Sequence, residues 1–291
     1  MEDAAEFLVT RAAIVLAGLF GAVWGSFFNV CIARVPLGQS VVRPASRCMA
    51  CGAGVRAIDN VPVLSYFWLR GRCRACGAPF SPRYALVEAL MGVLSALLFW
   101  KLVAADPDGL VAIRLARFAL YFAFCGVLVV LSFIDLDTLL LPDVITLPAI
   151  PLLYLAAFGA HDASWSERLI GAAAGYLFVW LLSEGYYYFL KREGMGMGDG
   201  KLLAMMGATL GWKALPLILF AGSFLGAAIS LPLLLLARRR TRHAPGPSPA
   251  AEEESLARVQ VPFGPFLALA GILYLFLGDL VWRAVTVSME G

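Results

Sequence analysis

The stretch IRLARFALYFAFCGVLVVLSFI, residues 113–134, decides the fold class of this chain. A helix needs about 20 predominantly apolar residues to cross the hydrocarbon core of a bilayer, and this stretch is long enough to do so. Similar runs recur along the chain: 61% of the 291 residues are hydrophobic and only 15% are charged. In ordinary soluble domains about a quarter of the residues are charged. The sequence therefore predicts an all-α polytopic membrane protein and excludes an ordinary soluble domain.

Eight apolar segments are candidates for membrane-spanning helices. The sixth is short, and only Gly211-Trp212-Lys213 separates it from the seventh. The expected spans cover residues 12–34, 84–104, 113–134, 144–160, 168–190, 201–212, 214–236 and 261–283.

Basic residues are concentrated in alternate loops. The loops 35–83, 191–200 and 237–260 carry arginine or lysine, whereas the loops 105–112 and 161–167 have neither. Cytoplasmic loops of membrane proteins carry an excess of these residues. With eight spans, every basic loop falls on one side, which we assign to the cytoplasm. Merging the sixth and seventh spans would put the bases of 237–260 on the opposite side.

Four of the six cysteines lie in the loop 35–83, as two C-x-x-C pairs. Two such pairs suit one tetrahedral Zn²⁺ held by four thiolates, and a site with four protein ligands is structural because it leaves no position for water. The alternative is a pair of disulfides, which are rare in a reducing cytoplasm. Cys31 and Cys125 lie inside predicted spans and are expected to be core residues. The expected metal ligands are Cys48, Cys51, Cys73 and Cys76.

Four aspartates lie where predicted spans meet the expected cytoplasmic face. Asp135, Asp137 and Asp143 follow the third span, and Asp199 lies in the glycine-rich stretch GMGMGDGKLL, residues 194–203. Ionisable residues at membrane spans are costly and usually functional. Asp143 can instead cap the fourth helix, Asp137 can be a solvated loop residue, and Asp199 can cap the sixth helix. A cap does not need four neighbouring glycines, which we expect to admit the backbone of a substrate.

Two carboxylates that approach each other share a proton, so that one can act as general base on water and the other as general acid. Asp135 and Asp199 are the best candidates for such a pair. The sequence has only two histidines, His161 and His243, in loops on opposite faces, which excludes a Ser-His-Asp arrangement or a zinc protease site. Because Asp199 begins a helix and Asp135 ends one, the helix dipoles predict that Asp199 is ionised and acts as the base.

The assembled motifs resemble those of the type IV prepilin peptidases, the GxGD class of membrane aspartic proteases. The resemblance extends over nearly the whole chain. It rests on GSFFNVCIARVP (25–36), the two cysteine pairs with DNVPVLSYFWLRGRCRAC (59–76), FIDLDTLLLPD (133–143), EGMGMGDGKLLA (193–204) and PFGPFLALAG (262–271).

The resemblance implies that Asp135 and Asp199 are the catalytic pair, in an enzyme of the bacterial inner membrane. It implies a prepilin or pseudopilin substrate with a short basic leader, cut at the cytoplasmic face, in pilus assembly or type II secretion. Many members also methylate the new N-terminus with S-adenosylmethionine, and Gly71 is the residue the resemblance assigns to methyl transfer. The four cysteines would bind zinc. The partners expected are the substrate and membrane lipid, with no nucleic acid.

The expected domains are a first membrane helix in residues 1–34, a cytoplasmic cysteine-rich domain in residues 35–83 and a membrane peptidase domain in residues 84–291. Three alternatives stay open. The protein can be a peptidase with a merely structural cysteine loop, a transporter whose aspartates relay ions, or an assembly scaffold. Transport sites usually lie near the bilayer midplane, whereas these aspartates are expected at one face.

Overall fold

The computed structural model describes most of the chain. His161 and His243 fall outside the described residues, as do the first two residues of the stretch 194–203. The described ranges are 10–106, 108–160, 163–190, 196–241 and 262–290.

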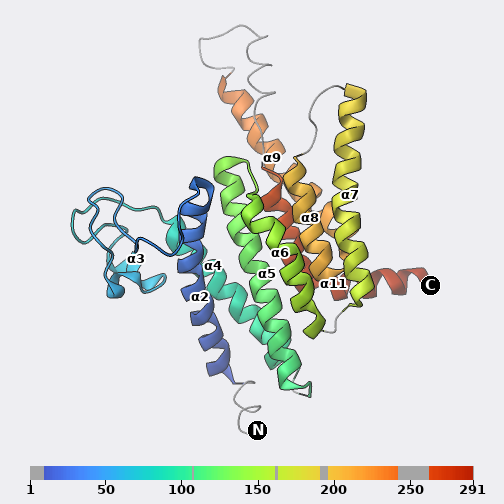
Figure 1. Cartoon of the computed structure of the whole chain (residues 1–291), viewed down its shortest axis with the longest axis horizontal. Coiled ribbons are helices and arrows are strands. Elements are labelled where there is room, and N and C mark those ends of the chain that lie inside the picture. Colours follow the sequence, from blue (N-terminus) through green and yellow to red (C-terminus); the bar gives the residue numbers. More distant parts are fainter. Residues whose placement is uncertain (1–9, 107, 161–162, 191–195, 242–261, 291) are drawn as a thin grey trace. The chain divides into compact units, whose positions relative to one another are not determined.

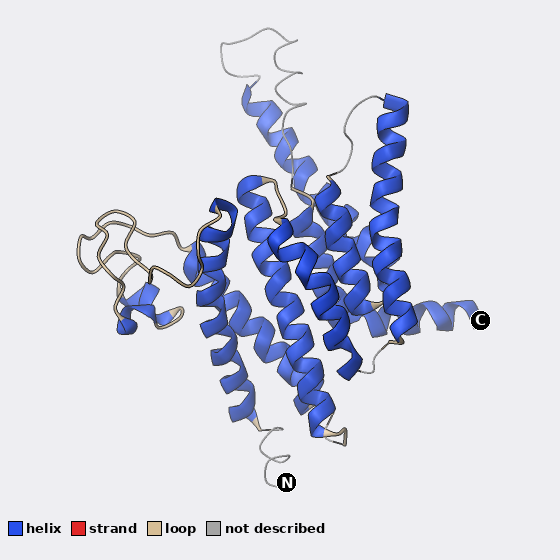
Figure 2. Cartoon of the chain, in the orientation of Figure 1, coloured by secondary structure: helices blue, strands red, loops and turns tan. Residues whose placement is uncertain are grey.

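The described residues form helices, of which α2 and α4 are joined by a long segment, and none of the described residues belongs to a named strand (Figures 1 and 2). A five-residue helix, α3 (Leu64–Trp68), lies in the cysteine loop. The longer helices are α2 (Arg11–Arg34), α4 (Arg83–Phe99) with a π-helical extension η3 (Trp100–Ala104), α5 (Val111–Thr138), α6 (Asp143–Ala156), α7 (Trp165–Leu190), α8 (Met197–Leu210), α9 (Ala214–Thr241) and α11 (Gly264–Glu290).

Each of the eight expected spans corresponds to one of these longer helices. Six are long and apolar enough to cross a membrane alone, whereas α6 and α8 have 14 residues each. A helix of that length is about 21 Å long, which is short of the hydrocarbon thickness. The helices α8 and α9 are separate, with a break at Gly211 where φ is +84°. The helix α9 continues to Thr241, so the expected loop 237–260 begins later than predicted.

The described residues group into two compact units. One consists of the residues up to Ile134 together with Leu152–Ala160, and the other of Asp135–Pro151 with the residues from Ala163 onward. In the first unit α2 packs along α4. Here the backbones touch: a Cβ added at Gly25 would lie 2.7 Å from the Cα of Glu88. Small residues allow such contact between membrane helices, where no hydrophobic effect drives association.

The second unit holds two close helix pairs, α7 with α8 and α9 with α11. A Cβ on Gly207 of α8 would overlap the backbone carbonyl of Gly171 on α7, and a Cβ on Gly175 would lie 2.7 Å from the Leu203 carbonyl. The C-terminal end of α8 is held by buried Arg168, whose guanidinium donates to the Thr209 carbonyl. The short helix α8 is therefore fixed along its length by α7.

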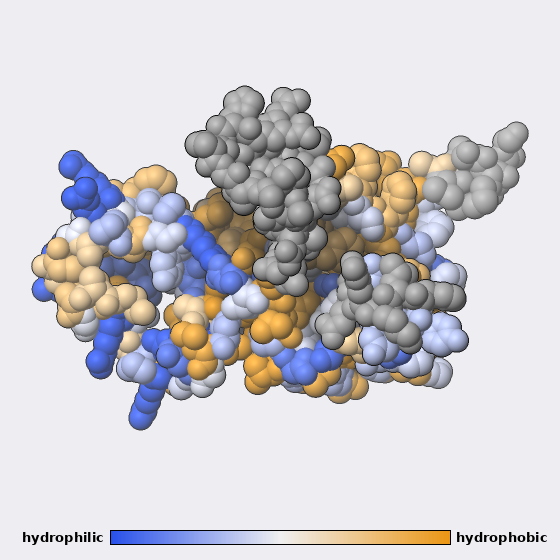
Figure 3. Space-filling view, turned by 90° about the horizontal axis from the view of Figure 1, so that it is seen from above, coloured by the Kyte–Doolittle hydropathy of each residue, from blue (hydrophilic) through white to orange (hydrophobic). Residues whose placement is uncertain are grey.

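The segment between α2 and α4 is the longest part of the described chain without a long helix. It begins after α2 with the turn Val35–Leu37 and continues to α4. Its polar residues include a bidentate pair, in which Arg74 donates to both carboxylate oxygens of Asp59 at 2.6–3.0 Å. In Figure 3 hydrophilic side chains gather over this loop at the left. Many large apolar side chains of the helices are exposed, as expected for surfaces that face lipid.

Candidate active site and metal centre

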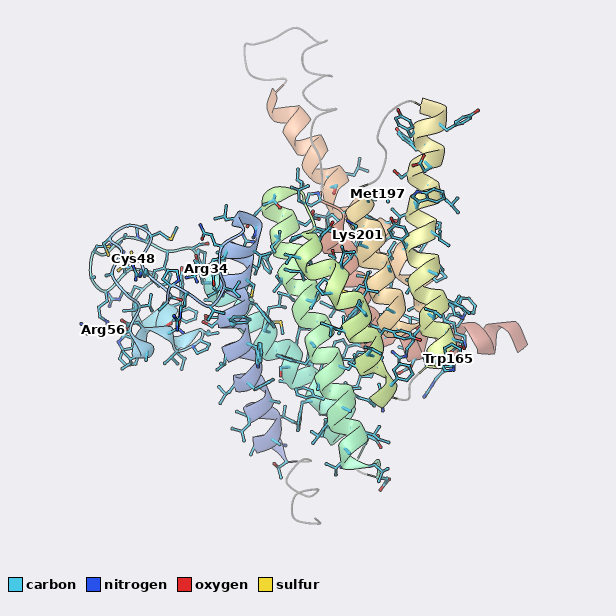
Figure 4. The ribbon with its side chains drawn as sticks, viewed as in Figure 1. Arg34, Cys48, Arg56, Trp165, Met197 and Lys201 are labelled. Carbon is cyan, nitrogen blue, oxygen red and sulfur yellow. The ribbon has the colours of Figure 1, made fainter. Side chains whose placement is uncertain are left out.

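Asp199 lies in the first turn of α8. Its helix begins at Met197 with Gly196 in the N-cap position, and no side chain caps it. The prediction that Asp199 begins a helix is therefore confirmed, but Asp199 is inside the first turn and is not the cap. Figure 4 labels Met197 and Lys201, which enclose Asp199 in this turn.

Asp135 lies in the last turn of α5, with only 6% of its surface exposed. The backbone N–H of Gly264, the first residue of α11, donates to Asp135 Oδ2 at 3.1 Å. A Cβ added at Gly264 would lie 2.6 Å from the same oxygen. A side chain at this position would therefore require the Asp135 carboxylate to move. Sequence reasoning included Gly264 in a motif but gave it no role, and its signal was the Gly-Pro pair that opens the last helix.

Asp199 lies close enough to Asp135 for the charge of Asp135 to act on its carboxyl. Burial of the Asp199 carboxyl, reinforced by the charge of Asp135, raises the pKa of Asp199 to about 7. The raised pKa favours the protonated form of Asp199, whereas the helix dipole favours its ionised form. The dipole is worth about 0.3–1 kcal/mol, which is less than one pKa unit, and it does not offset the loss of hydration.

The glycines beside Asp199 have a packing role. A Cβ at Gly198 would meet the side chain of Leu141 at 3.2 Å, and one at Gly200 would meet Val179 at 3.3 Å. These glycines let α8 approach its neighbours on both sides of Asp199. That the glycines of this stretch also admit the backbone of a substrate stays a prediction.

The other two aspartates differ from expectation in detail. Asp137 is exposed, as a solvated residue should be, but it belongs to the last turn of α5 and not to a loop. Asp143 is the first residue of α6, and its Oδ1 accepts a hydrogen bond from Lys201 Nζ at 2.5 Å. The pairing with Lys201 was missed, because a carboxylate 58 residues away in the chain leaves no local signal.

The four cysteines of the loop form one cluster. Their sulfur atoms all lie within 4.8 Å of one another, and Cys48 Sγ is 3.8 Å from Cys76 Sγ. A tetrahedral Zn²⁺ with bonds of about 2.3 Å to sulfur places its ligand atoms about 3.8 Å apart. All six cysteines of the chain are described and none is in a disulfide. The cluster fits a metal ion held by Cys48, Cys51, Cys73 and Cys76 and does not fit the disulfide alternative.

The two cysteine pairs have matching backbone turns. Cys48 N–H donates to Ala53 O at 2.8 Å, and Cys73 N–H donates to Ala78 O at 2.9 Å. Gly52 and Gly77 both have φ of +72°, a left-handed conformation that glycine adopts without strain. Hydrogen bonds from the backbone of Cys51, then Ala50, lower the pKa of the Cys48 thiol to about 6. The knuckle geometry predicted from the glycines is confirmed.

Gly71 has a structural explanation. Its φ is +64°, its N–H donates to Tyr66 O at 2.9 Å, and a Cβ would lie 3.0 Å from the Tyr66 ring. The bond from Gly71 to Tyr66 closes the turn that follows α3, in which Arg70 is also left-handed, with φ of +52°. Tyr66 also lines an open pocket of about 630 Å³, together with Val63, Phe67, Ser81, Pro82, Arg83, Ala85, Leu86 and Ala89.

The chain matches two family profiles and several curated proteins. Residues 19–102 match the bacterial peptidase A24 N-terminal domain, and residues 122–231 match the type IV leader peptidase family. A protein of Aeromonas hydrophila called prepilin leader peptidase/N-methyltransferase is 38% identical over 92% of both chains. Proteins with the same name from Pseudomonas putida and Myxococcus xanthus are 36% identical, over 93% and 92% of this chain and 93% and 91% of their own lengths. No solved structure gives a significant match.

These similarities cover both the cysteine loop and the helices that carry Asp135 and Asp199. The two profile matches include every motif on which the resemblance rests except the PFGPF segment. Together with six apolar helices long enough to cross a membrane, they make this a multi-pass inner membrane protein. The chain belongs to the type IV leader peptidase family.

Proposed function

We propose that this protein is a membrane aspartic endopeptidase that removes the leader from type IV prepilins or pseudopilins and methylates the new N-terminus. The observation that carries the peptidase assignment is the electrostatic interaction between the buried Asp135 and the partly exposed Asp199, in a chain 38% identical to a named prepilin leader peptidase/N-methyltransferase. A pair of carboxyls whose environments differ is what acid–base hydrolysis by aspartates requires.

Protonated Asp199 donates a hydrogen bond to the carbonyl of the scissile bond, and Asp135 takes a proton from the attacking water. Two observations support this assignment of acid and base. The pKa of Asp199 is raised to about 7, and the N–H of Gly264 donates a hydrogen bond to Asp135 Oδ2, which favours the ionised form of Asp135. The bond from water oxygen to the carbonyl carbon forms first. The C–N bond then breaks, and the leaving amine takes up the proton gained by Asp135. The two carboxyls titrate as a unit, so each role belongs to the pair as much as to one residue.

The cysteine loop and the catalytic pair face the cytoplasm in this proposal. The support is the concentration of bases in the loop 35–83, 191–200 and the segment 237–260. A substrate with a basic leader would keep that leader on the same side, where Asp199 lies at the start of its helix. In this proposal the apolar outer surface of the membrane helices contacts lipid and the hydrophobic helix of the substrate.

We assign methyl transfer to the domain of residues 35–83 and peptide cleavage to the domain of residues 84–291. S-Adenosylmethionine supplies the methyl group when bound. The open pocket that Tyr66 lines supports this assignment, because about 630 Å³ is within the range of small-molecule sites. Gly71 is not in the lining of this pocket but lies against the Tyr66 ring. Gly71 would act there by letting the Tyr66 ring approach the backbone.

The metal that we propose for the four cysteines is Zn²⁺, in a structural role. Thiolates at tetrahedral spacing are its preferred ligands, and a four-thiolate site has no open position for catalysis. The ion would hold the two knuckles together across a loop with few helices.

The test is a processing assay with detergent-solubilised protein, a prepilin with a basic leader and S-adenosylmethionine, read by product mass. Wild type should cleave and add a methyl group, whereas Asp135→Asn and Asp199→Asn should not cleave. Cleavage without methylation would leave a peptidase with a structural cysteine loop. Equal cleavage by all three proteins would reject the catalytic pair and favour a scaffold or transporter.

A further inference from the structure

The first turn of α8 presents three different faces to its surroundings. Successive residues of an α-helix are rotated by about 100°. Gly198 faces Leu141, and Gly200 faces Val179 and Tyr176 of α7. Asp199 lies between these two packed faces. The direction of its side chain is therefore fixed by what α8 contacts on either side.

Lys201 reinforces one of these contacts. It is three residues after Gly198 and returns to the same face of the helix, as residues at i and i+3 do. Its Nζ contacts Asp143 Oδ1 at 2.5 Å, so α8 contacts the first residue of α6 through an ion pair and the turn before α6 through Leu141. Figure 4 labels Lys201 near the start of α8.

The turn that α8 contacts comes directly from the helix of Asp135. Leu139 has φ of +56°, and its N–H donates to the Asp135 carbonyl at 2.9 Å. A left-handed conformation costs a non-glycine residue on the order of 1 kcal/mol, and here it sets the direction in which the chain leaves α5. Leu141 and Asp143 follow in the same turn. The short segment 139–143 thus follows the helix of Asp135 directly and contacts the helix that carries Asp199.

We propose that Lys201 and Asp143 are positioning residues of the peptidase, which clamp the turn 139–143 onto the first turn of α8 and thereby set the geometry of Asp135 and Asp199. The proposal rests on the proposed catalytic pair. Neither residue touches the reacting atoms: Lys201 points from the face of Gly198, and Asp143 is eight residues beyond Asp135.

The Lys201–Asp143 ion pair is too exposed to contribute much to the overall stability of the protein, which distinguishes a positioning role from a general stabilising role. The side chains of Lys201 and Asp143 are 22% and 57% exposed. Ion pairs at this exposure add about 0.2–1 kcal/mol to stability, so their loss should hardly change thermal unfolding. The geometry of catalysis is more sensitive, since a displacement of about 1 Å can cost about a hundredfold in rate.

The experiment compares Lys201→Met, Asp143→Asn and the double variant for leader cleavage, thermal unfolding and methylation of an already cleaved substrate. We expect kcat for cleavage to fall about tenfold in each single variant, with KM within about twofold. The double variant should match the singles, because both remove one interaction. Lys201→Arg, which keeps the charge, should retain most of the activity.

Lys213→Met is the matched control. It breaks an ion pair of similar length, 2.6 Å to Glu167, just beyond the other end of α8. It should leave kcat unchanged. The proposal is overturned if Lys201→Met cleaves at the wild-type rate, if the two single effects add in the double variant, or if Lys213→Met loses as much activity. A parallel loss of methylation and of thermal stability in Lys201→Met would assign the pair to general folding and also overturn it. Asp199→Asn in the same series tests the proposed function separately, since cleavage by that variant would reject the catalytic pair itself.

Discussion

Replacing Gly264 by alanine should disable the peptidase without unfolding the protein. The new Cβ would lie 2.6 Å from Asp135 Oδ2, whereas real Cβ atoms keep at least 3.0 Å from such neighbours. The oxygen must therefore retreat by about 0.4 Å or more, and the N–H···O bond of 3.1 Å stretches toward its limit. A shift of about 1 Å can cost about a hundredfold in rate, so we expect kcat to fall about tenfold or more.

The assay is leader cleavage under single-turnover conditions, with circular dichroism to follow folding. Gly185→Ala is the matched control, because a Cβ at this position of α7 meets nothing within 4 Å. A helical Gly→Ala change in open space should stabilise by about 0.5–1 kcal/mol and leave cleavage unchanged. Wild-type cleavage by Gly264→Ala would show that the contact between α11 and Asp135 does not set the catalytic geometry, and would refute the reasoning.

Three further predictions concern the protonation of Asp199, the metal site and the packing of α8 against α7. Because the pKa of Asp199 is raised to about 7 and its protonated form is the one we assign as acid, kcat/KM should fall as the pH rises through about 7; a profile flat from pH 6 to about 9 would contradict this. Purified protein should contain one zinc ion per chain by elemental analysis, and Cys73→Ser should lose it, whereas Cys125→Ser, outside the cluster, should keep it. Gly207→Ala should lower the unfolding temperature, because its Cβ overlaps the Gly171 carbonyl; unchanged unfolding would show that α7 and α8 can separate without cost.

The helices could be predicted from the sequence because membrane spans have a local signal. Length and hydropathy located all eight longer helices, and Gly211-Trp212-Lys213 marked the break between α8 and α9. Helix ends were less certain. The helix α5 includes Asp135 and Asp137 and α9 extends to Thr241, because polar residues continue a helix beyond its apolar part.

The chemistry-bearing residues of the site could be predicted, but their partners could not. C-x-x-C spacing predicted the sulfur cluster, and isolated carboxylates at the membrane edge singled out Asp135 and Asp199. The Gly264 contact with Asp135 spans 129 residues, and nothing in either local sequence indicates it. The raised pKa of Asp199 could not be predicted for a related reason, since burial depends on neighbours that a single sequence does not place.

The close contact of α7 with α8 limits how a peptide can reach the candidate active site. Backbone meets backbone at Gly171 and Gly207 and again at Gly175 and Leu203, and Gly200 lies against Val179, so along this stretch no gap between the two helices is wide enough for another chain. A substrate arriving sideways through the lipid therefore cannot part α7 from α8 to reach Asp199. A substrate that enters from the lipid therefore has to approach Asp199 from another side of α8, because the contact between α7 and α8 blocks access from the side of α7.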